Sequence, residues 1–194
     1  MATLAAEAEP VAASARPFVP DHPSLGSLRE AAAGCRGCDL YTHATQTVFG
    51  EGPARARLMF VGEQPGDSED VQSRPFVGPA GKLLRSSFEK AGISAKDAYI
   101  TNAVKHACAP WLEAEIALTR PELVVALGAT AAQALLGGSF RLTQHRQEVL
   151  SSHLAPRVAA TVHPSSILRA DEDSREREIE AFVEDLRWIA GLLE

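Results

Sequence analysis

Three polar side chains stand where short apolar runs of the sequence end: Glu63, Asn102 and His163. A carboxylate can orient water or stabilise a cation, and an amide can both donate and accept hydrogen bonds. An imidazole can donate a hydrogen bond to a developing anion. If the apolar runs are parallel strands, their carboxyl ends meet at one edge of the sheet, where ligands bind. The sequence therefore predicts a functional cleft at that edge.

A second group of residues has the types and spacing of metal ligands. Cys35 and Cys38 form a Cys-Arg-Gly-Cys segment, and His106 and Cys108 follow far downstream. A C-x2-C pair lets two thiolates face one metal centre, and a distant pair completes four ligands. Zinc and an iron-sulfur cluster both accept three Cys and one His. A redox dithiol or incidental thiols are the alternatives.

The elements that must position these residues alternate between strands and helices. Apolar runs typical of buried strands cover residues 57–62, 98–102, 123–127 and 158–162, with an edge strand at 147–151, and helical patterns cover 25–33, 82–91, 110–118, 128–136 and 173–193. This alternation predicts a parallel sheet with helices on both faces. We therefore expect an α/β fold, a single-domain α/β/α sandwich around a central, mainly parallel four-stranded sheet.

Length and composition fit one soluble domain. The chain has 194 residues, of which 45% are hydrophobic and 23% charged. No apolar run approaches the roughly 18 residues of a membrane span. Residues 1–24 lack the pattern of a secretion signal and are expected to form a flexible tail before one domain at residues 25–194. We expect a monomer in the bacterial cytosol and nucleoid, with no membrane partner.

The net charge of −6 does not exclude a nucleic-acid partner. Residues 171–185 carry eight carboxylates and two arginines, which account for the whole net charge. The rest of the chain is neutral on balance, so a cationic groove can exist on another face. A doubly wound nucleotide hydrolase is disfavoured because no G-x-x-x-x-G-K-[ST] phosphate loop occurs.

Several motifs between residues 35 and 169 resemble the uracil-DNA glycosylase superfamily. They are Gly62-Glu-Gln-Pro-Gly-Asp67, Arg74-Pro-Phe-Val-Gly-Pro-Ala-Gly81, Thr101-Asn-Ala-Val-Lys-His106, Leu127-Gly-Ala-Thr130, Thr143-Gln-His-Arg146 and Thr161-Val-His-Pro-Ser-Ser-Ile-Leu-Arg169. They are similar to the iron-sulfur type-4 enzymes and most similar to the UdgX branch. Gln64 and His106 carry the UdgX likeness, since type-4 enzymes usually have Ala and Cys there.

The resemblance implies a protein that flips uracil out of DNA and cleaves its N-glycosidic bond, leaving an abasic site. Phe76 would stack on the flipped base, and Asn102 would pair with N3 and O4 of uracil and reject cytosine. His163 would donate to the uracil O2 as negative charge develops there. Glu63 would orient water and stabilise the sugar cation.

The resemblance also places supporting residues around this site. Gln64 and Asp67 would complete the catalytic set, with Asp70 as a further candidate. Contacts to the DNA backbone are expected from loop amides, short polar side chains and cations, because helix starts favour phosphate. The candidates are Gly78, Lys82, Thr130, Ser165, Ser166 and Arg169, with a second basic spot at Arg141, His145 and Arg146. The substrate would be uracil-containing DNA, single-stranded as well as double-stranded.

By the same resemblance Cys35, Cys38, His106 and Cys108 would hold a [4Fe-4S] cluster with a structural role, zinc being the alternative. The sequence departs from the family here. Only Ala107 separates the last two ligands, where UdgX has a basic loop with the His that attaches covalently to DNA. Either the protein lacks the loop and water is the nucleophile, or the loop exists and is omitted from the sequence. Covalent attachment is expected only in the second case.

One rival function remains open from another class. Loss of the loop could leave a non-catalytic, metal-containing DNA-binding protein on the same fold. Substitution of Glu63 and His163 separates the two, because an enzyme loses product formation and a binding protein only changes affinity.

Overall fold

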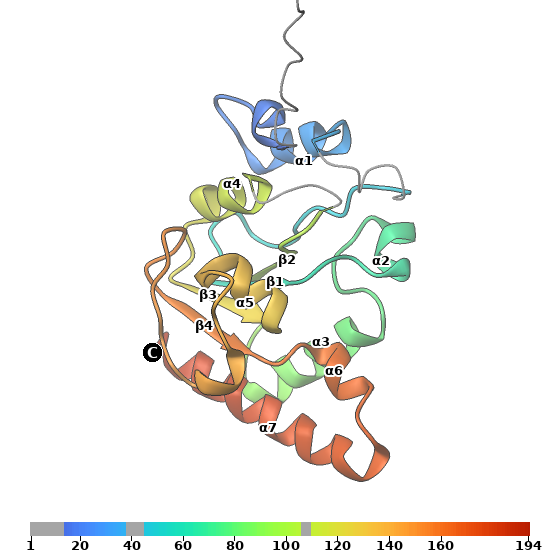
Figure 1. The fold of residues 1–194 in the computed structure, drawn as a ribbon, viewed down its shortest axis with the longest axis vertical. Helices are drawn as coiled ribbons and strands as arrows, with labels where there is room; N and C mark the ends of the chain where they lie inside the picture. The colour runs from blue at the N-terminus through green and yellow to red at the C-terminus, as the bar shows by residue number, and fades with distance from the viewer. Residues whose placement is uncertain (1–13, 38–44, 106–109) are drawn as a thin grey trace, which may run out of the picture.

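The computed structural model describes residues 14–37, 45–105 and 110–194, and it centres on one parallel sheet (Figure 1). The strands are β1 (Leu58–Gly62), β2 (Ala98–Asn102), β3 (Leu123–Leu127) and β4 (Val158–Thr161), in the order β2-β1-β3-β4. In the register of the sheet Gly62 lies opposite Asn102, and Leu127 lies opposite Thr161. The prediction of an α/β fold with a four-stranded parallel sheet is confirmed.

Helices connect and cover these strands. They are α1 (Leu25–Ala33), α2 (Asp67–Gln72), α3 (Pro79–Ala91), α4 (Pro110–Thr119), α5 (Ala129–Leu136), α6 (Pro164–Leu168) and α7 (Glu172–Gly191), with short 3-10 turns at Arg16–Phe18 and Leu142–Gln144. Pro79 and Pro164 stand in the first turn of α3 and α6, where the proline's missing N–H costs no helical hydrogen bond. Gly92 ends α3 with φ 74°, a left-handed conformation that favours glycine.

One face of the sheet is covered by α3 and α7. Leu58 and Phe60 of β1 belong to the same buried cluster as Leu84 and Phe88 of α3 and Phe182 of α7. Figure 1 shows α3, α6 and α7 together on this side of the sheet. The closing helix thus packs its apolar stripe on the sheet, and its acidic residues between 172 and 180 are left largely exposed.

The other face is covered by α4 and α5. Met59 and Val61, which alternate with the residues of the first cluster along β1, pack with Leu112 and Ile116 of α4 and Leu135 of α5. Because both faces of β1 are buried, the strand is a continuous apolar run. The molecule is therefore the α/β/α sandwich expected from the sequence.

Residues 14–24 are the part of the expected tail that lies within the described residues. Ala15 is fully buried in a third cluster with Leu28 and Ala32 of α1, Phe49 and Trp111. The other residues between 14 and 24 are exposed or half-buried. The remaining tail residues, 1–13, lie outside the described residues.

Other local elements also differ from expectation. The edge strand at 147–151 is reduced to one antiparallel bridge, between Leu150 and Val158. Helices α2 and α6, each only five or six residues long, occupy segments that carry turn signals rather than helical periodicity. No helix within the described residues is both long and apolar enough to cross a membrane.

Candidate active site

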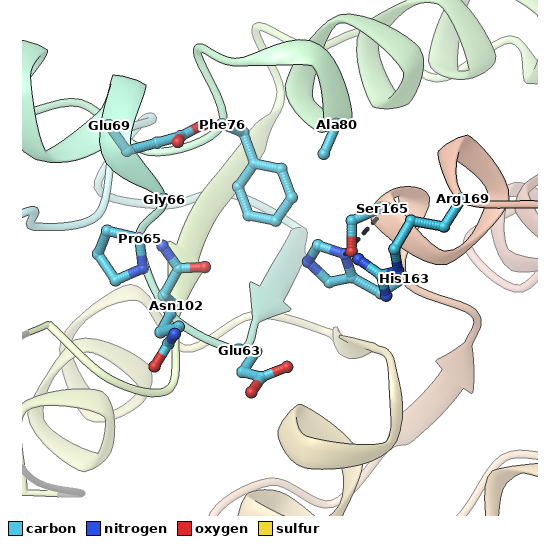
Figure 2. Close-up of a pocket in the computed structure, with 11 residues that line it drawn as sticks. Glu63, Pro65, Gly66, Glu69, Phe76, Ala80, Asn102, His163, Ser165 and Arg169 are labelled. Carbon is cyan, nitrogen blue, oxygen red and sulfur yellow. Dashed lines mark hydrogen bonds between the residues drawn. The ribbon is translucent and has the colours of Figure 1, made fainter.

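A cavity of about 340 Å³ opens at the carboxyl edge of the sheet, beside the ends of β1, β2 and β4 (Figure 2). Its lining comes from these strand ends and from α2, α3 and α6. The lining residues are Glu63, Gln64, Pro65, Gly66, Glu69, Phe76, Ala80, Asn102, His163, Ser165 and Arg169. Glu63, Asn102 and His163 thus meet at one edge, because parallel strands end on the same side of their sheet.

Asn102 is the last residue of β2 and is only 2% exposed. Its amide lies beside Gly62, the residue opposite it in β1. A Cβ at residue 62 would collide with the Asn102 Oδ1 and would come within 2.6 Å of the Phe76 ring. Glycine at the end of β1 therefore makes room for both an amide and an aromatic ring at the floor of the cavity.

Phe76 presents its ring to the cavity from a strained backbone. Its φ is 55°, a left-handed value that is uncommon for a non-glycine residue. Gly81 of α3 packs directly on the Phe76 carbonyl, with no room for a Cβ between them. The ring centroid lies 5.8 Å from that of His163, with 33° between the planes. Figure 2 shows the two rings projecting into the same space, which suits a flat ligand.

His163 is the N-cap residue of α6, and its ring orientation is fixed by that cap. Nδ1 accepts the backbone N–H of Ser165 at 3.1 Å and lies 2.7 Å from the Ser165 hydroxyl. An acceptor Nδ1 places the ring proton on Nε2. Burial lowers the pKa of the imidazole below its ordinary value, and the nearby Glu63 carboxylate offsets part of that effect. The site therefore holds a neutral imidazole with one N–H donor.

Glu63 and Gln64 begin the loop after β1, and both side chains are exposed at the cavity. The Glu63 carbonyl accepts the N–H of Val104 at 3.0 Å, which joins this loop to the one that follows Asn102. A solvent-accessible carboxylate beside a neutral imidazole can orient water or stabilise positive charge.

Asp67, Asp70 and Glu69 occupy different places on α2. Asp67 is exposed and is not among the cavity-lining residues, whereas Glu69, which is not one of the predicted site residues, lines the cavity. Glu69 Oε1 accepts the N–H of Gly78 at 2.9 Å. Asp70 accepts the N–H groups of Thr45 and Gln46, a structural role. Glu69 could have been selected only if the short helix α2 had been predicted, because the helix decides which of its carboxylates faces the cavity.

The residues expected to contact DNA lie in different surroundings. Ser165 and Arg169 line the cavity, whereas Lys82 and Thr130 are exposed outside its lining. Ser166 donates its hydroxyl to the His163 carbonyl at 2.7 Å and so stabilises the start of α6. Gly78 donates its N–H to the Glu69 carboxylate, so this amide is not available to bind a phosphate.

The second basic spot is held by internal partners. Arg146 pairs with the buried Asp185 at 2.7 Å, and Arg141 donates to the carbonyls of Gly138 and Phe140. His145 lies 2.8 Å from the Glu148 carboxylate. These partners favour a structural role for the spot over phosphate binding.

Cys35 is the one expected metal ligand within the described residues; Cys38, His106 and Cys108 lie outside them. Cys35 is 6% exposed, and its sulfur accepts the N–H of Gly37 at 3.4 Å. In the same cluster the Trp111 Nε1 is buried without a hydrogen-bond partner in the described part of the chain. A buried sulfur with an amide donor suits a thiolate ligand. The described residues alone contain no group of three or more ligating side chains.

Comparison with known proteins agrees with this geometry. The family model of the uracil DNA glycosylase superfamily matches residues 49–187. A type-4 uracil-DNA glycosylase of Thermotoga maritima is 38% identical over 150 residues, which cover 70% of this chain and 78% of the relative. A type-4 uracil-DNA glycosylase of Pyrobaculum aerophilum is 34% identical over 166 residues, covering 75% and 85%. Since the match spans the sheet and every residue that lines the cavity, the chain belongs to the uracil DNA glycosylase superfamily.

Proposed function

We propose that the protein is a uracil-DNA glycosylase, which flips uracil out of DNA, cleaves its N-glycosidic bond and leaves an abasic site. The observation that carries the proposal is the joint presence of a neutral His163 donor, the Asn102 amide and the Phe76 ring in one cavity. An enzyme that acts on a base needs such a pocket to hold the base outside the stack. The names of the relatives, type-4 uracil-DNA glycosylase, support it.

Recognition of uracil rests on complementary hydrogen bonds. The Asn102 amide offers one acceptor and two donors, which match N3–H and O4 of uracil. Cytosine presents an acceptor at N3 and a donor at its amino group, so the same amide orientation leaves buried polar atoms unpaired. Phe76 supplies a stacking surface for the ring. These two residues are the proposed specificity determinants.

Cleavage places negative charge on the leaving uracil and positive charge on the sugar. The C1′–N1 bond breaks, its electron pair leaves with the uracil, and a water oxygen bonds to C1′. We assign His163 Nε2–H to the uracil O2, where a donor strengthens its bond as charge develops. Glu63 accepts a proton of the attacking water and stabilises the sugar cation. Solvent protonates the departing uracil.

The proposed substrate is uracil-containing DNA, single-stranded as well as double-stranded. Ser165 and Arg169 are the backbone contacts that the cavity supports best, since both line it beside His163. Lys82 and Thr130 remain candidates at the starts of α3 and α5. We propose that the protein acts as a monomer.

We propose a [4Fe-4S] cluster on Cys35, Cys38, His106 and Cys108, with zinc as the alternative. When bound, the group serves as a structural cross-link between the chain around residue 35 and the segment before α4. The buried Cys35 sulfur, with its amide donor, supports this assignment. Visible absorption and elemental analysis of the purified protein distinguish iron from zinc.

We also propose a UdgX-like character, supported by Gln64 at the cavity. Covalent attachment to DNA is expected only if the His loop between residues 106 and 108 exists in the protein. Without it, water is the nucleophile and the enzyme turns over.

The test uses a uracil-containing oligonucleotide, alkali treatment and a denaturing gel that resolves protein–DNA adducts. We expect a cleaved product without a shifted band, and Glu63→Gln should lower its rate at least tenfold. Glu122→Gln, which alters an exposed ion pair with Arg57 at the opposite edge of the sheet, is the matched control. Binding without product from the folded wild-type protein would instead support the non-catalytic DNA-binding protein. A band that survives denaturation would show that the covalent loop is present.

A further inference from the structure

A buried ion pair lies behind the end of β2. The side chains of Lys105 and Glu115 are both 0% exposed, and Lys105 Nζ lies 2.6 Å from Glu115 Oε2. Lys105 follows Asn102 by three residues, and Glu115 belongs to α4, on the sheet face opposite α7. Neither charge lines the cavity, and the proposed chemistry does not use them.

The Glu115 carboxylate is fully supplied with donors. Oε1 accepts the N–H of Gly50 at 3.1 Å and the Tyr99 hydroxyl at 2.8 Å. Oε2 accepts the Thr101 hydroxyl at 3.0 Å as well as Lys105. Burial and the adjacent carboxylate raise the pKa of Tyr99 well above its ordinary value, which keeps its phenol a donor. The carboxylate thus joins β2, α4 and the segment at residue 50.

Stability alone does not account for such a pair. Desolvation of two charges offsets most of their attraction, so apolar residues of similar volume often stabilise a core as well. A buried, hydrogen-bonded network of polar groups does, however, specify one arrangement of its surroundings. The relevant question is therefore which groups this arrangement fixes.

The pair fixes the backbone on both sides of the Asn102 side chain. Lys105 Nζ donates to the Asn102 carbonyl at 2.6 Å, and Thr101, the preceding residue, donates to Glu115. Beyond Asn102, the N–H of Ala103 donates to the Gly62 carbonyl at 2.8 Å. These bonds set the direction in which the end of β2 presents the amide.

We propose that Lys105 and Glu115 are positioning residues that hold the Asn102 amide in the orientation that reads uracil, and so set the affinity for the base and the discrimination against cytosine. The inference rests on the proposed function, in which Asn102 contacts the base. The inference predicts that base recognition and bond cleavage respond differently to loss of the pair. Uracil binding weakens and KM rises, while kcat, which depends on His163, changes little.

The decisive variant replaces both charges by apolar side chains, Lys105→Met with Glu115→Leu, since this leaves neither charge unpaired in the core. The dissociation constant of free uracil is measured by calorimetry, and kcat and KM are measured on a uracil oligonucleotide, all well below the unfolding temperature. We expect uracil binding to weaken about tenfold and kcat to change less than threefold, because the amide becomes free to reorient. Glu122→Gln serves as control, with wild-type values.

A double-mutant cycle with Asn102→Ala distinguishes positioning from a structural role. If the pair acts through Asn102, its replacement in the Asn102→Ala background weakens uracil binding no further. Additive losses, or wild-type affinity and KM in the folded double variant, would overturn the inference. If the double variant does not fold, Thr101→Val removes one bond to Glu115 isosterically, and an unchanged uracil affinity there overturns it equally. A wild-type protein that neither binds nor releases uracil would refute the proposed function itself.

Discussion

The two outer strands of the sheet, β2 and β4, are anchored by the same type of contact, but the two contacts differ in their exposure to solvent. In each, a threonine near the strand end donates its hydroxyl to a buried carboxylate on a covering helix: Thr101 of β2 to Glu115, and Thr161 of β4 to Asp185. The two helices, α4 and α7, lie on opposite faces of the sheet. Each outer strand also receives one isolated antiparallel bridge on its free side. The ends of β2 and β4 are thus anchored by the same type of contact, which is formed separately on each face of the sheet.

They differ in the cation that balances the carboxylate. Lys105 is fully enclosed beside Glu115, whereas the Arg146 side chain beside Asp185 is 40% exposed. An enclosed pair is screened little by salt, and an open pair is screened much more. The anchor behind Asn102 is therefore shielded from the surrounding solution, whereas the anchor two residues before His163 is open to it. In the proposed enzyme, the ion pair behind the base-recognition residue Asn102 is thus less sensitive to salt than the ion pair near His163.

The largest expected effect is on kcat when His163, after β4, is replaced. It tests whether bond cleavage and base recognition depend on different strand ends. His163→Ala removes the proposed donor to the uracil O2, and loss of one such donor costs about 10²–10³ in kcat. The dissociation constant of free uracil should change less than threefold, because His163 acts mainly on developing charge. Single-turnover kinetics and calorimetry measure the two quantities. An equal loss in kcat and in uracil affinity would contradict the proposal that base recognition and bond cleavage depend on different residues.

An intermediate effect on stability and kcat is expected when Asp185, which anchors β4, is replaced. Asp185→Asn weakens the bonds to Thr161 and Arg146, and we expect the free energy of unfolding to fall by about 1–3 kcal/mol. Because β4 leads into His163, kcat should fall about threefold to tenfold while uracil affinity stays unchanged. Urea denaturation and steady-state kinetics provide the measurements. Weakened uracil binding in this variant would contradict the independence of the anchors.

The smallest effect concerns pH. Burial lowers the pKa of His163 below its ordinary value near 6.5, so the imidazole stays neutral down to that pH. The unfolded chain takes up this proton first, so the stability contributed by neutral His163 is present above about pH 6.5 and is lost as pH falls toward the folded pKa.

We accordingly expect kcat to vary less than about twofold between pH 6.5 and 8 and to fall only below that range, since protonation breaks the contacts of Nδ1. Ser165→Ala removes one donor to Nδ1 and should move the acid limb upward. An acid limb above pH 6.5 in the wild-type pH–rate profile would be inconsistent with a neutral, buried His163.

Much of this architecture follows from local patterns. The strands at residues 58–62, 98–102, 123–127 and 158–161 are short apolar runs buried on both faces, which is a strong signal. Once they are parallel, the meeting of Glu63, Asn102 and His163 follows from topology. Phe76 could be selected only through its motif, because a buried Phe is otherwise an ordinary core residue.

The anchors were not predictable in the same way. Lysine and glutamate are rarely fully buried, so Lys105 and Glu115 look like surface residues in the sequence. A signal was nevertheless present, since Glu115 occupies the buried stripe of α4 between Trp111 and Thr119. Its four partners are Gly50, Tyr99 and Thr101 of β2, and Lys105 just after β2, and only the folded chain brings them to α4.

The Lys105–Glu115 contact also closes a loop in the covalent chain. It joins the residue before segment 106–109 to the helix that begins at Pro110. Since each doubling of a loop's length adds only about 0.6 kcal/mol to its closure cost, the chain between these points can be exchanged or lengthened cheaply. The enclosed pair thus makes this position a natural insertion point, where evolution or an engineer can vary the chain between Lys105 and Pro110 while β2 and α4 stay joined.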